Sequence, residues 1–353
     1  MFRILELTLA LVCVQRDPIL LEQPVWILEQ PRPAESRLRG VAVSSTGVVW
    51  ATGADGAVLT RKPGRNQFVR LTIPDSDRRD FRDVEVLGEE TIFLLAIGEG
   101  EKSRILKSKD GGISWSTRFI MTDPKGFLDA IAFWDERHGI ALGDPVAGRF
   151  TILLTDDGGE TWTPIPESNS PEARSGEGAF AASGTCLSVS GSDRAWFCTG
   201  GAGPARVFLS TDRGRTWSAH DTPIPALNSS SGLFSVAFRD ELHGIAVGGD
   251  YRETEKAGAV VSVTTDGGIT WNLPTGRAPV GLRSAVVFVS ASVAGTEKAW
   301  VAVGPAGSDL SLDDGQTWQP VPSEGFHAVG TRGRESIWSV GEVGRVGRLK
   351  LGQ

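Results

Sequence analysis

An eight-residue pattern, Ser/Thr-x-Asp-x-Gly-x-x-Trp, occurs five times in this chain of 353 residues. Its aspartate can accept hydrogen bonds from nearby backbone N–H groups, and its glycine can adopt a positive φ without steric conflict. The pattern therefore predicts a tight turn, followed by a strand whose tryptophan packs over that turn. The aspartate and tryptophan of the five copies are Asp110 and Trp115, Asp157 and Trp162, Asp212 and Trp217, Asp266 and Trp271, and Asp313 and Trp318.

Each turn pattern belongs to a longer repeat, because successive aspartates are separated by 47, 55, 54 and 47 residues. An apolar or alternating stretch, such as 259–263, comes directly before the turn. Before this stretch lies a second one that ends in glycine, such as 243–248. A third stretch, such as 235–238, comes earlier still. Each unit therefore predicts three strands, a turn and a fourth strand, which is the four-stranded antiparallel blade of a β-propeller.

Two further units, at 48–60 and 337–349, keep the middle strands without the turn pattern. With them the chain has seven units, and the last unit lacks a fourth strand. A spare apolar stretch at 24–30 can supply that strand and cover an exposed sheet edge. The sequence therefore predicts an all-β protein in which residues 24–353 form a single seven-bladed β-propeller, closed by the N-terminal strand pairing with the last blade.

The five turn patterns resemble the Asp-box, or BNR repeat, of sialidases, sortilin-type propellers and photosystem II assembly factors of the Ycf48/HCF136 type. The middle-strand pattern Trp-x-x-Gly, as at 50–53, is most similar to the Ycf48-like group. The resemblance covers the chain from about residue 23 onward and implies a propeller comparable to WD40- and YVTN-like repeat proteins. It also implies protein binding through an arginine-rich surface. The turn itself specifies a blade and not a reaction.

Charge and the scarcity of histidine and cysteine argue against several other functions. The formal net charge is −7 and the pI about 5.3, so no overall attraction to nucleic acid exists. His138 and His243 hold equivalent places in the repeat, which indicates a structural role. The sequence predicts neither a metal site nor a cofactor, since its glycine-rich stretches precede no helix that could bind phosphate. Cys186 and Cys198, on expected neighbouring strands, are either buried thiols or a cross-strand pair.

Residues 1–23 resemble an export signal, because a charged start precedes an apolar run at 4–14. Glu6 interrupts that run, so a disordered N-terminus is the alternative, and Cys13 adds lipidation as a further one. No other stretch approaches the roughly 20 apolar residues of a membrane-spanning helix. We therefore expect an exported protein, periplasmic or extracellular.

A functional site is expected at the central funnel, where the inner strands of all blades begin. Polar side chains at these positions can bind a carboxylate, a sugar or a peptide through convergent groups. The loops 167–182 and 249–257 add further groups to the same rim. The predicted ligand- or partner-binding residues are Arg39, Arg82, Asp83, Asp129, Trp134, Asp144, Ser183, Tyr251, Arg252, Arg283 and His327.

Two functions follow from this organisation. The lack of a complete catalytic set favours a monomeric, non-catalytic scaffold that binds a protein or a small ligand at the funnel. The alternative is a glycan-acting hydrolase, sialidase-like or another glycosidase, in which funnel carboxylates would act. The catalytic candidates in that case are Asp129, Asp144, Glu177 and Tyr251, the one tyrosine of the chain.

Overall fold

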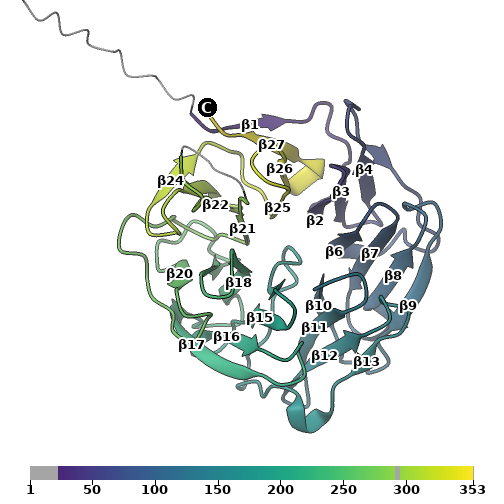
Figure 1. Cartoon of the computed structure of the whole chain (residues 1–353), viewed down its shortest axis with the longest axis horizontal. Helices are drawn as coiled ribbons and strands as arrows, with labels where there is room; N and C mark the ends of the chain where they lie inside the picture. The colour runs from purple at the N-terminus through teal and green to yellow at the C-terminus, as the bar shows by residue number, and fades with distance from the viewer. Residues whose placement is uncertain (1–22, 291–294, 353) are drawn as a thin grey trace, which may run out of the picture.

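The computed structural model describes residues 23–290 and 295–352. The predicted export signal at 1–23, except its last residue, and Cys13 lie outside the described residues. The described residues form seven antiparallel sheets. Figure 1 shows these sheets arranged as blades around a central axis. The chain is therefore a seven-bladed β-propeller, as the repeat predicts.

Blades 1 to 7 are numbered along the chain, and each runs from an inner strand at the axis to an outer strand at the periphery. The inner strands are β2 (Leu38–Val43), β6 (Asp80–Leu87), β10 (Leu128–Phe133), β14 (Leu187–Ser190), β18 (Ser231–Phe238), β21 (Ala285–Phe288) and β25 (Ala328–Thr331). The second strands are β3 (Val49–Gly53), β7 (Thr91–Ile97), β11 (Gly139–Val146), β15 (Arg194–Cys198), β19 (Gly244–Asp250), β22 (Trp300–Gly304) and β26 (Ile337–Val340).

The third and outer strands complete the blades. The third strands are β4 (Val58–Arg61), β8 (Arg104–Ser108), β12 (Arg149–Thr155), β16 (Pro204–Ser210), β20 (Val261–Thr264), β23 (Gly307–Ser311) and β27 (Val346–Lys350). The outer strands are β5 (Val69–Arg70), β9 (Ser116–Ile120), β13 (Thr163–Pro164), β17 (Ser218–Pro225), β24 (Trp318–Val321) and, in blade 7, β1 (Val25–Leu28). In blade 5 the outer strand is reduced to a single bridge between Val263 and Asn272.

Helix is confined to three short 3-10 turns in the described ranges: η1 (Gly100–Lys102), η2 (Glu167–Asn169) and η3 (Glu342–Gly344). None of them has the length or the apolar character needed to cross a membrane. The second strands are the most deeply buried elements, and every residue of β3, β22 and β26 is buried. Neighbouring blades cover both faces of these strands, so their sequences are apolar and small without alternation.

The N-terminal strand closes the ring. β1 pairs antiparallel with β27, in a sheet of order β1-β27-β26-β25. Figure 1 shows β1 alongside β27, close to the C-terminus. Trp26 in β1 is 7% exposed and packs on Phe326, with the ring centroids 4.7 Å apart. The predicted closure is confirmed, and it covers an edge that β27 would otherwise present to solvent.

The five repeated turns share one hydrogen-bond pattern, which the Asp266 turn illustrates. Thr264 Oγ1 donates to Asp266 Oδ1 at 2.8 Å, and the Thr270 N–H donates to the same oxygen at 2.9 Å. The indole N–H of Trp271 donates to the carbonyl of Gly268 at 3.0 Å. These residues therefore hold the turn itself together. Equivalent indole bonds are made by Trp115, Trp217 and Trp318, whereas Trp162 Nε1 has no partner among the described residues.

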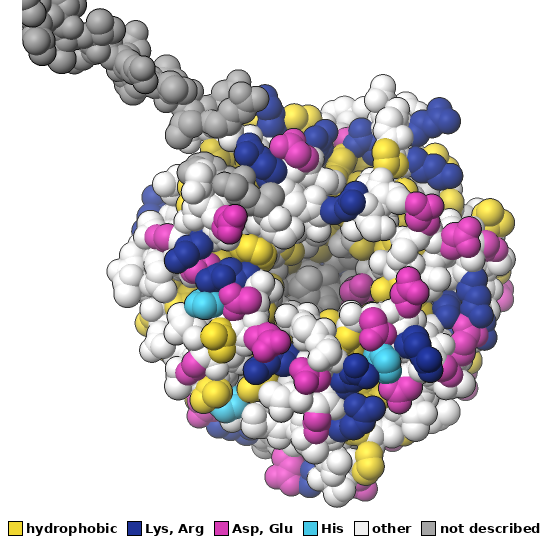
Figure 2. All heavy atoms as spheres, viewed as in Figure 1, with side chains coloured by type: hydrophobic (Ala, Val, Ile, Leu, Met, Phe, Trp, Pro, Cys, Tyr) yellow, Lys and Arg dark blue, Asp and Glu magenta, His cyan; other side chains and the backbone are white. Residues whose placement is uncertain are grey.

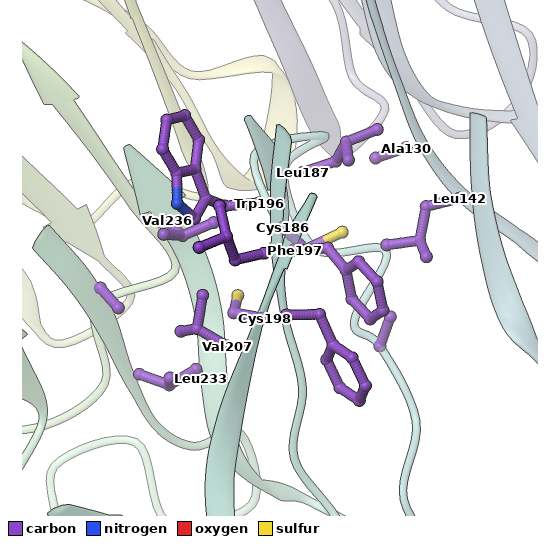
Figure 3. Packing of buried hydrophobic residues seen from close by; sticks show 14 of the residues in the cluster. Ala130, Leu142, Cys186, Leu187, Trp196, Phe197, Cys198, Val207, Leu233 and Val236 are labelled. Atoms are coloured by element: carbon purple, nitrogen blue, oxygen red, sulfur yellow. The ribbon is translucent and has the colours of Figure 1, made fainter. Parts of the chain in front are cut away.

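Large apolar side chains fill the spaces between blades, as Figure 3 shows around Trp196. Trp196 in blade 4 stacks on Phe238 of blade 5, with ring centroids 3.7 Å apart, and its N–H donates to the Gly267 carbonyl at 2.8 Å. Cys186 and Cys198 lie in the same cluster as buried, unbonded thiols. Burial raises the pKa of both thiols well above their ordinary value. Of the two alternatives for these cysteines, the structure shows the buried thiols.

Candidate functional site

The inner strands are bulged close to their first residues, and the bulges carry much of the site. The pairing with the second strand skips one residue in each of β2, β6, β10 and β18. A bulge bends the strand locally and re-aims the side chain of the extra residue. The skipped residues, which all line the central cavity, are Arg39, Arg82, Asp129 and Phe234.

The central cavity has a volume of about 600 Å³ and draws residues from all seven blades. Figure 2, a view of one face of the ring, shows the molecule hollowed at its centre, with side chains of both charges interspersed on that face. Inside the cavity, arginines come from blades 1 and 2, two aspartates come from blade 3, and Glu342 comes from blade 7. The lining residues are Arg37, Arg39, Arg82, Phe127, Asp129, Asp144, Ala179, Phe180, Ala181, Ala182, Phe234, Tyr251, Thr254, Leu282, Ser284, Pro305, His327 and Glu342.

Three arginines form the cationic wall. Arg82 is fixed by Asp80, which accepts from its Nε and Nη2 at 3.0 and 2.9 Å, and by the Ala181 carbonyl at 2.8 Å. Burial, and then the charges of Arg82 and Arg37, lower the pKa of Arg39 to about 10. The Nε atoms of Arg37 and Arg39 are buried without a hydrogen-bond partner among the described residues. Asp80 pairs with both Arg37 and Arg82 and balances part of the positive charge, while the wall keeps unused N–H donors.

His327 and Glu342 extend this wall from blade 7. The His327 Nε2 lies 2.7 Å from Glu342 Oε1. Burial, and then the charge of Arg39, lower the pKa of His327 to about 4, so the imidazole is neutral at pH 7 and donates to the carboxylate. Its Nδ1 is buried without a partner in the described ranges. The carboxylate of Glu342, which also lines the cavity, is thus already hydrogen-bonded to His327.

Asp129 and Asp144 form an acidic wall on blade 3. Asp129 is 1% exposed, and neither of its carboxylate oxygens has a hydrogen-bond partner among the described residues. Asp144 Oδ1 accepts from the Ala179 N–H at 2.9 Å. Burial raises the pKa of Asp144 to about 6, and burial together with the charge of Asp144 raises the pKa of Asp129 well above its ordinary value.

An aromatic group lies on blades 4 and 5. The rings of Phe180 and Phe234 are stacked, with centroids 4.1 Å apart and planes 6° from parallel. Tyr251 meets both rings edge-on, at 6.2 and 6.4 Å between centroids. Phe234 is buried and Tyr251 is 47% exposed, so the group runs from the floor of the cavity to its mouth. It offers an apolar surface to a ligand whose charged ends meet the two walls.

The structure brings six of the eleven predicted binding residues into the cavity, namely Arg39, Arg82, Asp129, Asp144, Tyr251 and His327. The others have structural surroundings. Asp83 is buried and accepts from the backbone N–H groups of Val84 and Ile131, each at 2.8 Å. Trp134 donates to the Arg194 carbonyl at 2.7 Å and so joins blades 3 and 4. Ser183 donates to the Ser284 carbonyl at 2.8 Å, and Arg252 is exposed beside the Tyr251 ring.

Arg283, the remaining predicted residue, lies outside the cavity because its register differs by one residue from the expected one. In blade 1 the Leu38 N–H donates to a glycine carbonyl of the preceding blade at 3.0 Å. In blade 6 the residue that makes this bond, also at 3.0 Å, is Arg283. Arg283 is therefore the equivalent of the buried Leu38, and its neighbour Ser284 is the residue that lines the cavity. A shift of one residue turns a strand side chain to the other face.

Glu177, a candidate acid of the hydrolase alternative, is also committed elsewhere. Its carboxylate forms a buried ion pair with Arg206 and accepts from Thr199 Oγ1 at 2.6 Å. Glu253, the carboxylate near Tyr251 in sequence, pairs with Lys256. Of the four catalytic candidates, only Asp129, Asp144 and Tyr251 therefore line the cavity.

Several residues that line the cavity are not among the predicted binding residues. The position directly after the glycine that ends a second strand could have identified some of them. Asp144, Pro305 and Glu342 each directly follow the glycine that ends a second-strand pattern, and all three line the cavity. That position would have predicted Glu342. Arg37 carries no comparable signal. Phe180 comes from an irregular loop of blade 4, so no strand period could place it.

The described residues contain no group of three or more His, Cys, Asp or Glu side chains placed to hold a metal ion. His138 and His243, the histidines at equivalent repeat positions, each bond through Nδ1 to the carboxylate of an aspartate three residues earlier. Both therefore stabilise a turn in the same way.

A pH dependence of stability follows from the acidic wall. The pKa of Asp144 rises from 3.8 to about 6 on folding, so between about pH 4 and 6 the folded state holds a proton that the unfolded state has lost. The contribution of this group to stability therefore falls as the pH rises through that window. Asp144→Asn removes this loss. The free energy of unfolding of the variant minus that of the wild type should therefore increase by about 1–3 kcal/mol between about pH 4 and 6 and then level off.

Denaturant unfolding of both proteins at several pH values measures this difference. His327 contributes with the opposite sign, since its pKa falls from 6.5 to about 4, but it is present in both proteins and cancels. An Asp156→Asn variant, changed at an exposed aspartate, is the matched control and should parallel the wild type. A parallel profile for Asp144→Asn would contradict the prediction.

The fold and this site define the class: a seven-bladed β-propeller with a polar central cavity. No protein-family model matches the chain, and no curated protein matches it. Solved structures similar to it include YCF48 bound to D1 peptide, at 18% identity and a TM-score of 0.61, covering 93% of this chain and 96% of that chain. YCF48 from Cyanidioschyzon merolae is 17% identical, with a TM-score of 0.65 and coverage of 93% and 98%.

A catalytically inactive virginiamycin B lyase from Staphylococcus aureus, with quinupristin, is also similar: 14% identity, a TM-score of 0.63, and coverage of 93% of this chain and 99% of that chain. At these identities the likeness shows the fold alone. Because the similar structures include both a lyase and a peptide-bound protein, the fold does not decide between catalysis and binding. The resemblance to the Ycf48-like group is thus supported at the level of the propeller.

Proposed function

We propose that this protein is a non-catalytic binding scaffold whose central cavity captures a carboxylate-bearing segment of a partner protein. The observation that carries the proposal is the convergence of Arg37, Arg39 and Arg82 on one wall of the cavity. The Nε donors of Arg37 and Arg39 are buried and unused among the described residues. Guanidinium groups bind carboxylates through charge-assisted, often paired hydrogen bonds, and partial burial strengthens them.

A chain end suits this cavity, because a terminal carboxylate can enter it and reach the arginines among the lining residues of all seven blades. A C-terminal carboxylate presents two oxygens to the forked guanidinium groups without needing an exit for the chain beyond it. YCF48, a similar propeller, has been found with a bound peptide, which supports a peptide as the class of ligand. Export and a monomeric state, expected from the sequence, complete the proposal.

The hydrolase alternative finds less support in the arrangement of side chains. Its candidate Glu177 is neutralised by Arg206, and the carboxylate next to Tyr251 in sequence is held by Lys256. The acidic pair that remains lies on blade 3, whereas the unused arginine donors lie on blade 1. A binding role would use the arginines, the two aspartates and the aromatic group, whereas hydrolysis would use the aspartates alone.

The proposal is tested with two random-sequence hexapeptide libraries, one with free C-terminal carboxylates and one with C-terminal amides. The immobilised full chain should retain the carboxylate library at least about tenfold more strongly, because each charge-assisted hydrogen bond contributes about 1.5–3 kcal/mol. Mass spectrometry of the retained peptides measures the difference.

The variants Arg39→Gln and Arg82→Gln should each reduce the carboxylate preference about tenfold or more. Arg118→Gln is the matched control, since Arg118 pairs with Glu160 on the outer part of a blade and lies away from the cavity. Equal retention of the two libraries by the wild type would refute the proposed function.

A further inference from the structure

The two aspartates of the acidic wall form no ion pair among the residues that the structure describes. Asp129 is 1% exposed, and neither carboxylate oxygen has a hydrogen bond of good geometry; the nearby N–H groups of Ala181 and Asp144 and the charge of Arg82 offset only part of the rise in its pKa that burial causes. Asp144 beside it uses one oxygen to accept from a backbone N–H and has no ion pair in the described ranges. Buried carboxylates are almost always paired, because burial without a counter-charge is strongly unfavourable. An acid that lines a cavity without an ion pair is therefore suited to a cationic group supplied from outside the chain.

The arginine on the neighbouring blade does not meet this need. Arg82 directs Nε and Nη2 to Asp80 and its Nη1 to the Ala181 carbonyl, so it forms no hydrogen bond with Asp129, although its charge lowers the pKa of that acid. Arg39 and Arg37 belong to blade 1 and face the cavity beside His327 of blade 7. Positive and negative side chains thus line the same cavity, and no ion pair joins Asp129 or Asp144 to an arginine in the described part of the chain.

We propose that Asp129 and Asp144 form a subsite for an organic cation, so that the ligand of this cavity is zwitterionic and carries an ammonium or guanidinium group near its carboxylate. The inference rests on the proposed function, since it names the chemistry of the same ligand. A peptide whose C-terminal residues include lysine or arginine has this character. The carboxylate meets the arginines, and the basic side chain reaches the two aspartates.

The aromatic group favours an organic cation over a bare ion. Phe180, Phe234 and Tyr251 line the cavity on the blades that follow Asp129 and Asp144 in the ring. A lysine or arginine side chain has an apolar stem that packs on such rings, and its charge is attracted to their faces. A metal ion would need more ligands, and the described residues offer no third acidic, histidine or cysteine side chain grouped with this pair.

The experiment uses matched peptides drawn from the retained carboxylate library. Each lysine-containing peptide is compared with one in which norleucine replaces lysine, and with its C-terminal amide. Binding is followed by ¹⁹F NMR of the full chain labelled with 3-fluorotyrosine. Tyr251 is the one tyrosine, so a single signal at the cavity mouth reports occupancy.

We expect the norleucine peptides to bind the wild type at least about tenfold more weakly than the lysine peptides. In the variant Asp129→Asn/Asp144→Asn the two peptides should bind equally, while the preference for carboxylate over amide persists. Asp156→Asn is the matched control, because that aspartate is exposed and does not line the cavity. It should keep the lysine preference.

The outcomes separate the two proposals. A carboxylate preference without a lysine preference in the wild type overturns the zwitterion inference and leaves the proposed function intact. A lysine preference that survives in Asp129→Asn/Asp144→Asn also overturns it, because the cation then binds elsewhere. Absence of both preferences overturns both proposals. If the double variant does not unfold cooperatively, Asp144→Asn alone serves, with the lysine preference expected to fall at least about threefold and an unchanged preference counting against the inference.

Discussion

Replacement of Arg283 by alanine is expected to lower the free energy of unfolding by about 3–5 kcal/mol, because it leaves a buried carboxylate without its counter-charge. The Arg283 Nε and Nη2 lie 2.7 and 2.6 Å from Asp309 Oδ2, and the two side chains are only 4% and 5% exposed. Burial raises the pKa of Asp309, and the charge of Arg283 opposes that rise. Without the arginine, Asp309 must take up a proton or remain an unpaired buried charge. Thermal and denaturant unfolding measure the loss.

Two controls distinguish this structural role from a role in ligand binding. Arg283→Leu/Asp309→Val should recover most of the lost stability, because an apolar residue fills the equivalent place at Leu38 and well-packed apolar pairs commonly replace buried ion pairs without loss. The recovered double variant should also retain the carboxylate-preferring capture of peptides. If Arg283→Ala unfolds like the wild type but loses peptide capture, Arg283 belongs to the binding site after all.

Truncation of Trp26 to alanine should lower the free energy of unfolding by about 3–5 kcal/mol, the range typical of buried tryptophan. Trp26 is 7% exposed and packs on Phe326, which lies just before the last inner strand. Its loss removes the main apolar contact through which β1 holds the ring closed, so the edge of β27 opens to solvent. The measurement is denaturant unfolding, which should also show a lower midpoint.

The neighbouring residue provides the matched control for Trp26. Ile27 lies on the same strand, makes the same backbone pairing with β27, and is 51% exposed. Ile27→Ala should therefore change the free energy of unfolding by no more than about 0.5 kcal/mol. Equal effects of Trp26→Ala and Ile27→Ala would show that side-chain packing of β1 does not hold the ring together.

Much of the architecture could be predicted because its signals are local. The Asp266 turn needs only residues within a few positions of one another, so the same short pattern produces the same hydrogen bonds wherever it occurs. The period of the repeat then sets the blade, and the number of repeats sets the ring. Even the pairing of β1 with β27 follows from a count, since the last repeat lacked one strand and the N-terminus had one to spare.

The candidate site was predicted in part, and the error at Arg283 has a clear physical cause. Leu282, Arg283 and Ser284 can be aligned with the other inner strands in two registers that differ by one residue. The apolar Leu282 favours the register that places Arg283 with Arg39, whereas the backbone hydrogen bonds place Arg283 with Leu38. Pairing across strands far apart in the chain decides between them, and this is not visible in a single strand.

By itself the sequence determined the blades, the turns and the closing strand, because each depends on short-range hydrogen bonds or on a repeated period. The tertiary structure alone decided which polar side chains meet. Arg39 and Arg283 both stand near the start of an inner strand, yet one lines the cavity and the other is buried against Asp309. A bulge re-aims the first, and a carboxylate on the third strand of the same blade holds the second. Both depend on long-range pairing, which only the assembled ring supplies.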